Sequence, residues 1–148
     1  MGKVAVRLSS LAGIVVLGLI CGCGPGGPEI ASVEGTVTMD GKPLANAAVV
    51  FIPENGRPAG ATTDSQGHYV LNFTSGRKGA IPGKNSIRIT TLRDAGEDEN
   101  GNPIPAQRET VPMKYNAASE LTFEVKEGEK NVANFDLVSG GPLGPTEE

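Results

Sequence analysis

Apolar and polar side chains alternate along several short segments of the chain, and a period of two residues is typical of β-strands that bury one face. In segment 33–39, for example, Val33, Val37 and Met39 alternate with polar residues. The same alternation recurs in segments 69–73, 87–89, 121–125 and 133–137. These five segments are therefore expected to be half-buried strands.

Two further segments are expected to be strands for other reasons. Residues 47–52 form a continuous apolar run, which favours a central strand buried on both faces. Residues 60–63 are expected to form a short strand that ends at a turn. The pair Asp40-Gly41 supplies a tight turn after the first strand, with the glycine at a position of positive φ. A single loop, at 94–112, is long.

The composition agrees with many short strands. The 148 residues include 21 Gly and 11 Pro, and aromatic residues make up only 4%, so turns are frequent and large core residues are few. Short strands separated by glycine-containing turns indicate an antiparallel sandwich. We therefore expect one all-β domain, a seven-stranded antiparallel sandwich at 32–138, followed by a disordered tail at 139–148.

The N-terminal residues have a different pattern, which is typical of an export signal. Lys3 and Arg7 precede an apolar run at 11–20, and this run is too short to span a bilayer, which needs ~20 residues. A buried helix of the domain is the alternative, but the Gly and Pro residues at 22–28 would break it. We therefore expect a removable signal at 1–22 and a flexible tether at 23–31.

The end of this signal, Ile20-Cys21-Gly22-Cys23, resembles the lipobox of bacterial lipoproteins. Cys23 has a branched residue three positions before it and a small residue directly before it, whereas Cys21 follows the bulky Ile20. The resemblance implies a diacylglycerol on Cys23 and an acylated N-terminus carrying chains such as palmitate. Two or three chains are needed for stable anchoring, because one chain binds membranes only marginally.

Ordinary secretion is the rival interpretation of the two cysteines. A disulfide between Cys21 and Cys23 would span one residue, which suits disulfide geometry poorly. Cleavage after Gly22 leaves one cysteine, so neither a disulfide framework nor a thiolate metal cluster is expected. Gly24 stands where an aspartate marks inner-membrane retention in some bacteria, which favours the outer membrane.

The charge of the chain excludes one class of partner. The sequence holds 13 basic and 17 acidic residues. Removal of the signal takes away Lys3 and Arg7 and no acid, which leaves 11 basic residues against 17 acidic ones and a net charge of −6. Such a domain has no electrostatic footprint for nucleic acid.

Several motifs together resemble carboxypeptidase regulatory-like domains. They are VEGTV at 33–37, DGKPL at 40–44, AVVF at 48–51, TTDSQGHY at 62–69 and IPGKNSIRI at 81–89. VPMKYN at 111–116 followed by LTFEV at 121–125 is similar to the end of small lipoproteins of planctomycete-type bacteria. The resemblance covers residues 32–138 and implies a Greek-key sandwich of the prealbumin (transthyretin-like) type.

The resemblance also implies structural roles for particular residues. The turn residues are Asp40, Gly41, Asp64, Gly67, Pro82 and Gly83. Gly67 is expected to adopt positive φ, Asp64 to accept backbone amide bonds, and Tyr69 to point inward. At Asn85 the chain departs from the family, which usually has an aromatic residue there.

No catalytic site can be assembled from the sequence. The carboxypeptidases related to this family carry their zinc on a separate domain, and a catalytic zinc typically needs three protein ligands, whereas His68 is the sole histidine. A set made of Asp64, Ser65 and His68 lacks a third group to orient the base. We therefore expect a protein without enzymatic activity and without a cofactor.

The long loop raises one alternative, a calcium site with Asp94, Asp98 and Asn100 as candidate ligands. An EF-hand alignment fails, because its first and last positions fall on Gly96 and Gln107. A looser calcium site remains open, as does a solvated acidic loop. The leading hypothesis is a membrane-anchored lipoprotein whose sandwich binds an envelope protein or a saccharide, or has a structural role. The alternative is a calcium-stabilised adhesion or saccharide-binding module that uses loop 94–110.

Overall fold

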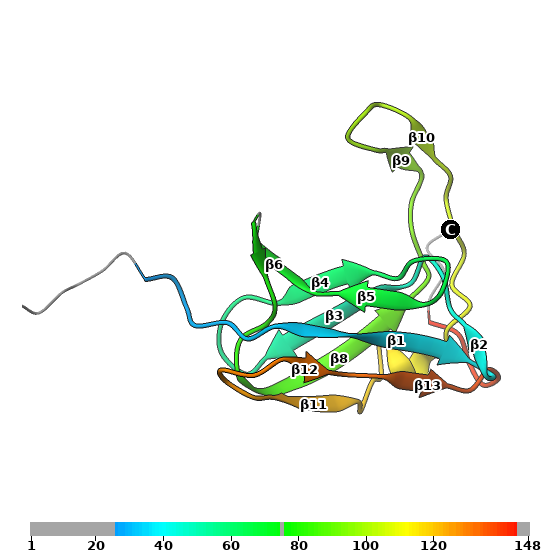
Figure 1. Cartoon of the computed structure of the whole chain (residues 1–148). Coiled ribbons are helices and arrows are strands. Elements are labelled where there is room, and N and C mark those ends of the chain that lie inside the picture. The colour runs from blue at the N-terminus through cyan, green and yellow to red at the C-terminus, as the bar shows by residue number, and fades with distance from the viewer. Residues whose placement is uncertain (1–25, 75, 145–148) are drawn as a thin grey trace, which may run out of the picture.

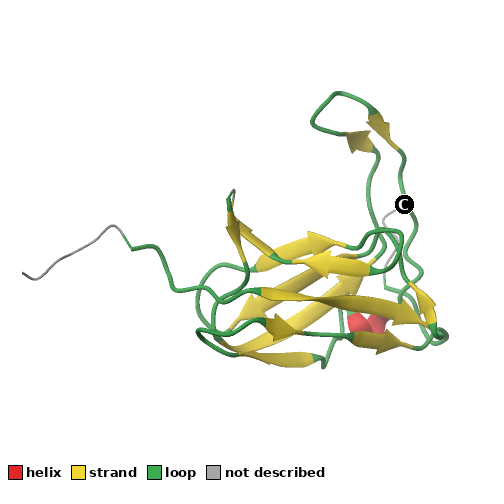
Figure 2. Ribbon diagram, in the orientation of Figure 1, coloured by secondary structure: helices red, strands yellow, loops and turns green. Residues whose placement is uncertain are grey.

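The computed structural model describes residues 26–74 and 76–144, and nearly every regular element within them is a β-strand (Figure 1; Figure 2). The lipidation site predicted at Cys23 and the predicted signal lie outside the described residues. One 3-10 turn, η1 (Met113–Tyr115), accompanies the strands. Within the described residues there is no helix of sufficient length and apolarity to cross a membrane.

The first sheet is built around β1 (Val33–Met39), which pairs on both of its sides. On one side, β12 (Asn131–Val132) and β13 (Phe135–Leu137) follow each other along β1 and run parallel to it. On the other side, β5 (His68–Val70) and β2 (Lys42–Pro43) run antiparallel to it. Because β1 has neighbours on both sides, it is the central strand of this sheet.

The second sheet has six strands in the order β11-β8-β3-β4-β6-β7. Its centre is the pair β3 (Ala48–Pro53) and β8 (Gly83–Thr90), which are antiparallel with Val50 opposite Arg88. The remaining strands are β11 (Thr122–Val125), β4 (Ala59–Thr62), β6 (Asn72–Thr74) and β7 (Arg77–Lys78). A separate two-stranded hairpin, β9 (Gly96–Glu97) and β10 (Pro103–Ile104), projects from the body of the molecule (Figure 1).

The two sheets face each other across an apolar core. Val33 and Val37 of the first sheet and Val49 of the second are fully buried. The ring of Phe51 meets Phe135 edge-on, with centroids 6.2 Å apart, and so joins the two sheets. Such aromatic pairs add roughly 0.5–1.5 kcal/mol beyond the area they bury. The all-β class expected from the alternation is therefore confirmed.

Two details of the strand predictions are wrong. The sandwich was expected to be antiparallel, and the other strand pairs are, but β1 pairs in parallel with β12 and β13. Residues 47–52 were expected to be buried on both faces, yet Val50 and Ile52 are only half-buried. Leu92, in the loop that follows β8, lies beside Val50 and Ile52 and covers the outer face of β3 only in part.

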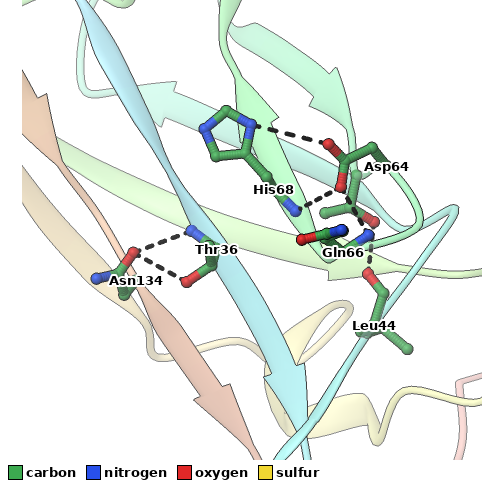
Figure 3. A network of polar contacts seen from close by, with 7 residues as sticks. Thr36, Leu44, Asp64, Gln66, His68 and Asn134 are labelled. Carbon is green, nitrogen blue, oxygen red and sulfur yellow. Dashed lines mark hydrogen bonds and ion pairs between the residues drawn. The ribbon is translucent and has the colours of Figure 1, made fainter.

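Gly35 permits a close approach at the centre of the first sheet. A Cβ at this position would lie 1.8 Å from the carbonyl oxygen of Ala133. That carbonyl accepts a hydrogen bond of 2.6 Å from the hydroxyl of Tyr69, whose side chain points into the core as expected. Burial raises the pKa of Tyr69. The neighbouring Asn134 side chain accepts hydrogen bonds from the amide and hydroxyl of Thr36 (Figure 3).

Four of the six residues predicted to shape turns, Asp40, Gly41, Asp64 and Gly67, lie in turns. Asp40 and Gly41 have φ values of +52° and +75°. In the turn before β5, Oδ1 of Asp64 accepts hydrogen bonds from the amides of Gln66 and His68, at 2.8 and 3.0 Å (Figure 3). These amides, Gln66 first, hold the pKa of Asp64 below its usual value.

Glycines provide unusual backbone angles in the Asp64–Gly67 turn and at the start of β8. Gly67, at φ +74°, is packed so that an added Cβ would lie 2.3 Å from the carbonyl oxygen of Val37. Pro82 precedes the first residue of β8, Gly83, which has φ +104°. Both glycines therefore hold conformations that residues with side chains rarely adopt.

Asn85 occupies a core position as a polar residue. It is fully buried opposite Phe123, and its amide nitrogen donates 3.0 Å hydrogen bonds to the carbonyls of Ile81 and Gly83. Its Oδ1 has no hydrogen-bond partner among the described residues. The side chain therefore ties the bend before β8 to the core at the cost of one unpaired oxygen.

Both ends of the described chain contact the sandwich. Ala31 bridges Ala80, and Arg77 donates a 2.7 Å hydrogen bond to the carbonyl of Pro28 in the predicted tether. At the other end, the amide of Met113 donates to the carbonyl of Pro142 at 2.8 Å. Residues up to 144 of the segment predicted as a tail therefore include backbone contacts with the domain, and the remaining residues lie outside the described range.

Candidate functional site

A groove lies on the outer face of the second sheet, where β3 and β8 run side by side. Its floor consists of the outward side chains of Val50, Ile52, Arg88 and Thr90. The period of two places these residues on the face opposite the core, because their neighbours Val49, Phe51, Ile87 and Ile89 are fully buried. The half-buried state of this face therefore creates a surface that a ligand can reach.

The walls of the groove come from segments that follow the two sheet strands in sequence. They are formed by Leu92, Glu109, Asn116, Ala117 and Gly144. The cavity measures about 390 Å³, within the range of roughly 300–1,000 Å³ typical of small-molecule sites. Leu92, which is 41% exposed, adds to the apolar character of the groove.

The carboxylate of Glu109 holds this wall together. It is only 6% exposed and accepts hydrogen bonds from six donors. The partners of Oε1 are the amides of Thr91, Thr110 and Val111 and the hydroxyl of Thr91, at 2.9–3.0 Å. The partners of Oε2 are the hydroxyl of Thr90 and, at 3.3 Å, the amide nitrogen of Asn116. One side chain thus fastens the chain leaving β8 to the chain that returns from the long loop.

The charge of Glu109 is favoured by this arrangement. Burial by itself would raise the pKa of the carboxyl group. The hydrogen bonds from the hydroxyl of Thr90, the amides of Thr91 and Val111 and the hydroxyl of Thr91 outweigh that effect, and the pKa lies below its usual value. Glu109 is therefore an anion whose oxygens are already engaged by the protein.

Beyond this wall the chain forms a projecting arm, residues 93–107, at the upper right of Figure 1. Arg93 bridges Gln107 at its base, with backbone hydrogen bonds of 2.9 and 2.8 Å. The β9–β10 hairpin lies further out. The arm therefore stands on a base that Glu109 fixes, directly beside the groove.

The calcium candidates lie on this arm. Oδ1 of Asp98 accepts hydrogen bonds from the amides of Asn100 and Asn102, at 2.9 and 2.8 Å, and Oδ2 accepts one from the side chain of Asn102 at 2.9 Å. These bonds, led by the Asn102 side chain, lower the pKa of Asp98. No contact brings Asp94 to them in the described structure. In residues 26–74 and 76–144, no three His, Cys, Asp or Glu side chains gather in a group that could hold a metal ion.

The only histidine, His68, lies on β5 of the first sheet and is not among the residues that line the groove. Nδ1 of His68 is 4.0 Å from Oδ2 of Asp64, and both side chains are well exposed (Figure 3). Because the other oxygen of Asp64 caps the turn before β5, the pair is part of a solvated turn.

Two groove residues, Arg88 and Glu109, were not singled out from the sequence. Arg88 is an exposed position in an alternating strand and Glu109 is one of several acids near the long loop. The sequence feature that points to this face is the apolar run at 47–52, because it places apolar residues on both faces of the strand.

Comparisons with known proteins leave the family open. No family model matches the chain, and no curated protein sequence matches it. One solved structure, a 9R-lipoxygenase from Cyanothece PCC8801, is similar over 74% of this chain with 16% sequence identity and a TM-score of 0.38. This chain spans 16% of the length of that lipoxygenase. A similarity at this level carries no conclusion about fold or activity.

Proposed function

We propose that this chain is a membrane-anchored lipoprotein whose β-sandwich is a non-catalytic binding or structural module of the cell envelope. The observation that carries the proposal is the Ile20-Cys21-Gly22-Cys23 sequence, which follows a basic start and a short apolar run. The path of the chain is compatible with it. The described chain before β1 leaves at one end of the sandwich (Figure 1), where the carbonyl of Pro28 still accepts a hydrogen bond from Arg77.

The sandwich is proposed to be a carboxypeptidase regulatory-like domain of the seven-stranded Greek-key, prealbumin-like type. Three features support this. Two sheets enclose one core, and the Asp64–Gly67 turn precedes an inward Tyr69. The first strand of the domain, β1, also pairs directly with the last strand, β13.

The proposed binding role rests on where the groove and the arm lie. The tether leaves one end of the sandwich, while the arm projects near the opposite end (Figure 1). A lipid-anchored domain with this layout would present the groove and the arm away from the anchor. The calcium-stabilised alternative has less support, because both carboxylate oxygens of Asp98 accept hydrogen bonds within the arm.

The anchor is tested by a pair of matched variants. Cys23→Ser is expected to abolish incorporation of labelled palmitate and to move the protein into the aqueous fraction. Cys21→Ser, two residues away, is expected to leave labelling and membrane binding unchanged. If Cys23→Ser remains acylated and membrane-bound, the proposal is wrong. Separation of the two membranes on a density gradient is expected to place the protein in the outer membrane.

A further inference from the structure

We propose that the groove binds a small carboxylate with an apolar body, with Arg88 pairing the carboxylate and the sheet floor contacting the apolar part. This inference deepens the proposed binding role and rests on it. It does not depend on the anchor, because none of the described residues that line the groove belongs to the N-terminal segment.

The floor and one wall favour an apolar body. Val50 and Ile52 lie side by side on the outer face of β3 and are only half-buried. Leu92 and Ala117 add exposed apolar surface at the sides. Covering such surface is favourable by roughly 25 cal/mol per Å² removed from water. An apolar ligand therefore gains binding free energy across most of the groove.

The polar groups that line the groove are already committed, with one exception. The hydroxyl of Thr90 donates to Glu109 and accepts from the amide of Leu92 at 3.1 Å. The Nδ2 atom of Asn116 donates to Glu109 and to the carbonyl of Val111, and its Oδ1 accepts from the amide of Ala117. A saccharide, which needs many hydrogen bonds, would find few available partners here.

Arg88 is the exception. Among the described residues it has no ion pair and no side-chain hydrogen bond. Among the described residues that line the groove, Arg88 is the only basic one. A guanidinium group offers a planar fork of donors that matches a carboxylate in a bidentate pair. The acid in the wall, Glu109, does not take this role, because its two oxygens accept from other donors.

The sign of the charge therefore selects the ligand. A cationic ligand would be repelled by Arg88 and would find the oxygens of Glu109 already engaged by other donors, and a neutral apolar ligand would leave the donors of Arg88 unused. An apolar carboxylate satisfies both the floor and the guanidinium. Its carboxylate is expected to lie over Arg88, with its apolar part extending over Val50 and Ile52.

The test uses the full chain carrying Cys23→Ser, with octanoate, octanol and octylamine as probes. Amide chemical shifts in a nuclear magnetic resonance titration are expected to move at Val50, Ile52 and Ala117 with octanoate. Octanol is expected to bind more weakly and octylamine not at all. Shifts confined to other parts of the domain, or octylamine binding equal to octanoate, would overturn the proposal.

Two variants separate the roles of charge and floor. Arg88→Gln is expected to weaken octanoate binding about tenfold, since a charge-assisted hydrogen bond is lost, and to leave octanol binding unchanged. Arg57→Gln, an exposed arginine in the loop after β3, is the matched control and should have no effect. Val50→Thr, nearly isosteric, should weaken octanoate and octanol alike. Unchanged octanoate affinity in Arg88→Gln refutes the inference, whereas the fate of Cys23→Ser in cells bears only on the anchor.

Discussion

Replacement of Glu109 by glutamine is the most direct test of how the groove wall is held. The change preserves the size of the side chain and removes its charge. In the native protein the carboxylate accepts six hydrogen bonds, three of them from the backbone amides of Thr91, Thr110 and Val111. In Glu109→Gln, the side-chain amide oxygen can still accept hydrogen bonds from these backbone amides. The new side-chain amide nitrogen would face the donor nitrogen of Asn116, so that hydrogen bond is lost.

The size of the effect follows from these contacts. A hydrogen bond to a charged group contributes about 1.5–3 kcal/mol, against about 0.5–1.5 kcal/mol for a neutral one. The hydrogen bonds to the remaining side-chain oxygen become weaker, because that oxygen is no longer charged, and at least the hydrogen bond from Asn116 is lost. We therefore expect Glu109→Gln to lower the free energy of unfolding by about 2 kcal/mol. Glu109→Ala leaves the buried amides of Thr91 and Val111 unpaired, at about 1–3 kcal/mol each, so its effect should be roughly twice as large.

The effect of Glu109 should depend on pH in a defined direction. Its pKa in the folded protein is lowered, so the carboxylate contributes stability that is fully present above its unfolded pKa, about 4.3. That contribution is lost as the pH falls through the lower folded value. The difference in stability between the native protein and Glu109→Gln is therefore expected to be largest at pH 7 and to shrink below about pH 4.

Urea unfolding of the native protein and the variant, measured between pH 7 and pH 3, provides the assay. Glu99→Gln, an exposed acid on the arm, serves as the control and should change stability by less than about 0.5 kcal/mol. Equal stability of Glu109→Gln and the native protein at pH 7 would refute the role assigned to this carboxylate. A difference that persisted unchanged at pH 3 would show that charge is not its cause.

Two further predictions concern the backbone of the sandwich. Gly67→Ala should destabilise the domain by more than about 2 kcal/mol in urea unfolding, because its Cβ would lie 2.3 Å from the Val37 carbonyl oxygen at φ +74°. Gly41→Ala, at nearly the same φ but with open space around it, should cost only about 1 kcal/mol, and equal losses would exclude the steric cause. Tyr69→Phe removes the 2.6 Å hydrogen bond to the Ala133 carbonyl and should lower the free energy of unfolding by about 1–2 kcal/mol; a variant as stable as the native protein would contradict this.

The strands were predictable because burial of one face of a strand requires apolar and polar residues to alternate along it. Val33 and Val37 are buried while their neighbours are not, which the period of two reports directly. The same period says nothing about pairing, so the parallel neighbours of β1 could not be inferred from it. A continuous apolar run such as 47–52 also does not reveal whether its outer face is covered, and Val50 and Ile52 are half-open.

The groove was harder to predict than the strands, because it depends on contacts between distant segments. In the sequence, nothing distinguishes Glu109 from the other acidic residues near the polar loop. Its burial depends on Thr90 and Thr91, which the fold brings beside it. The hydrogen bonds of Asp64 and the positive φ of Gly67, in contrast, belong to their own turn, so they could be expected from local sequence alone.

The parallel pairing of β1 with β13 has a consequence for how the domain would bear a mechanical load. β1 begins at the end of the sandwich from which the N-terminal segment leaves, and β13 runs in the same direction toward the opposite end (Figure 1). A force that pulls Ala31 and the chain after Leu137 apart, along the strands, would slide β1 and β13 past each other. Their hydrogen bonds would then be stretched together instead of opening one after another. The parallel pairing therefore predicts that the domain resists a force applied along β1 and β13 more strongly than one that peels the strands apart.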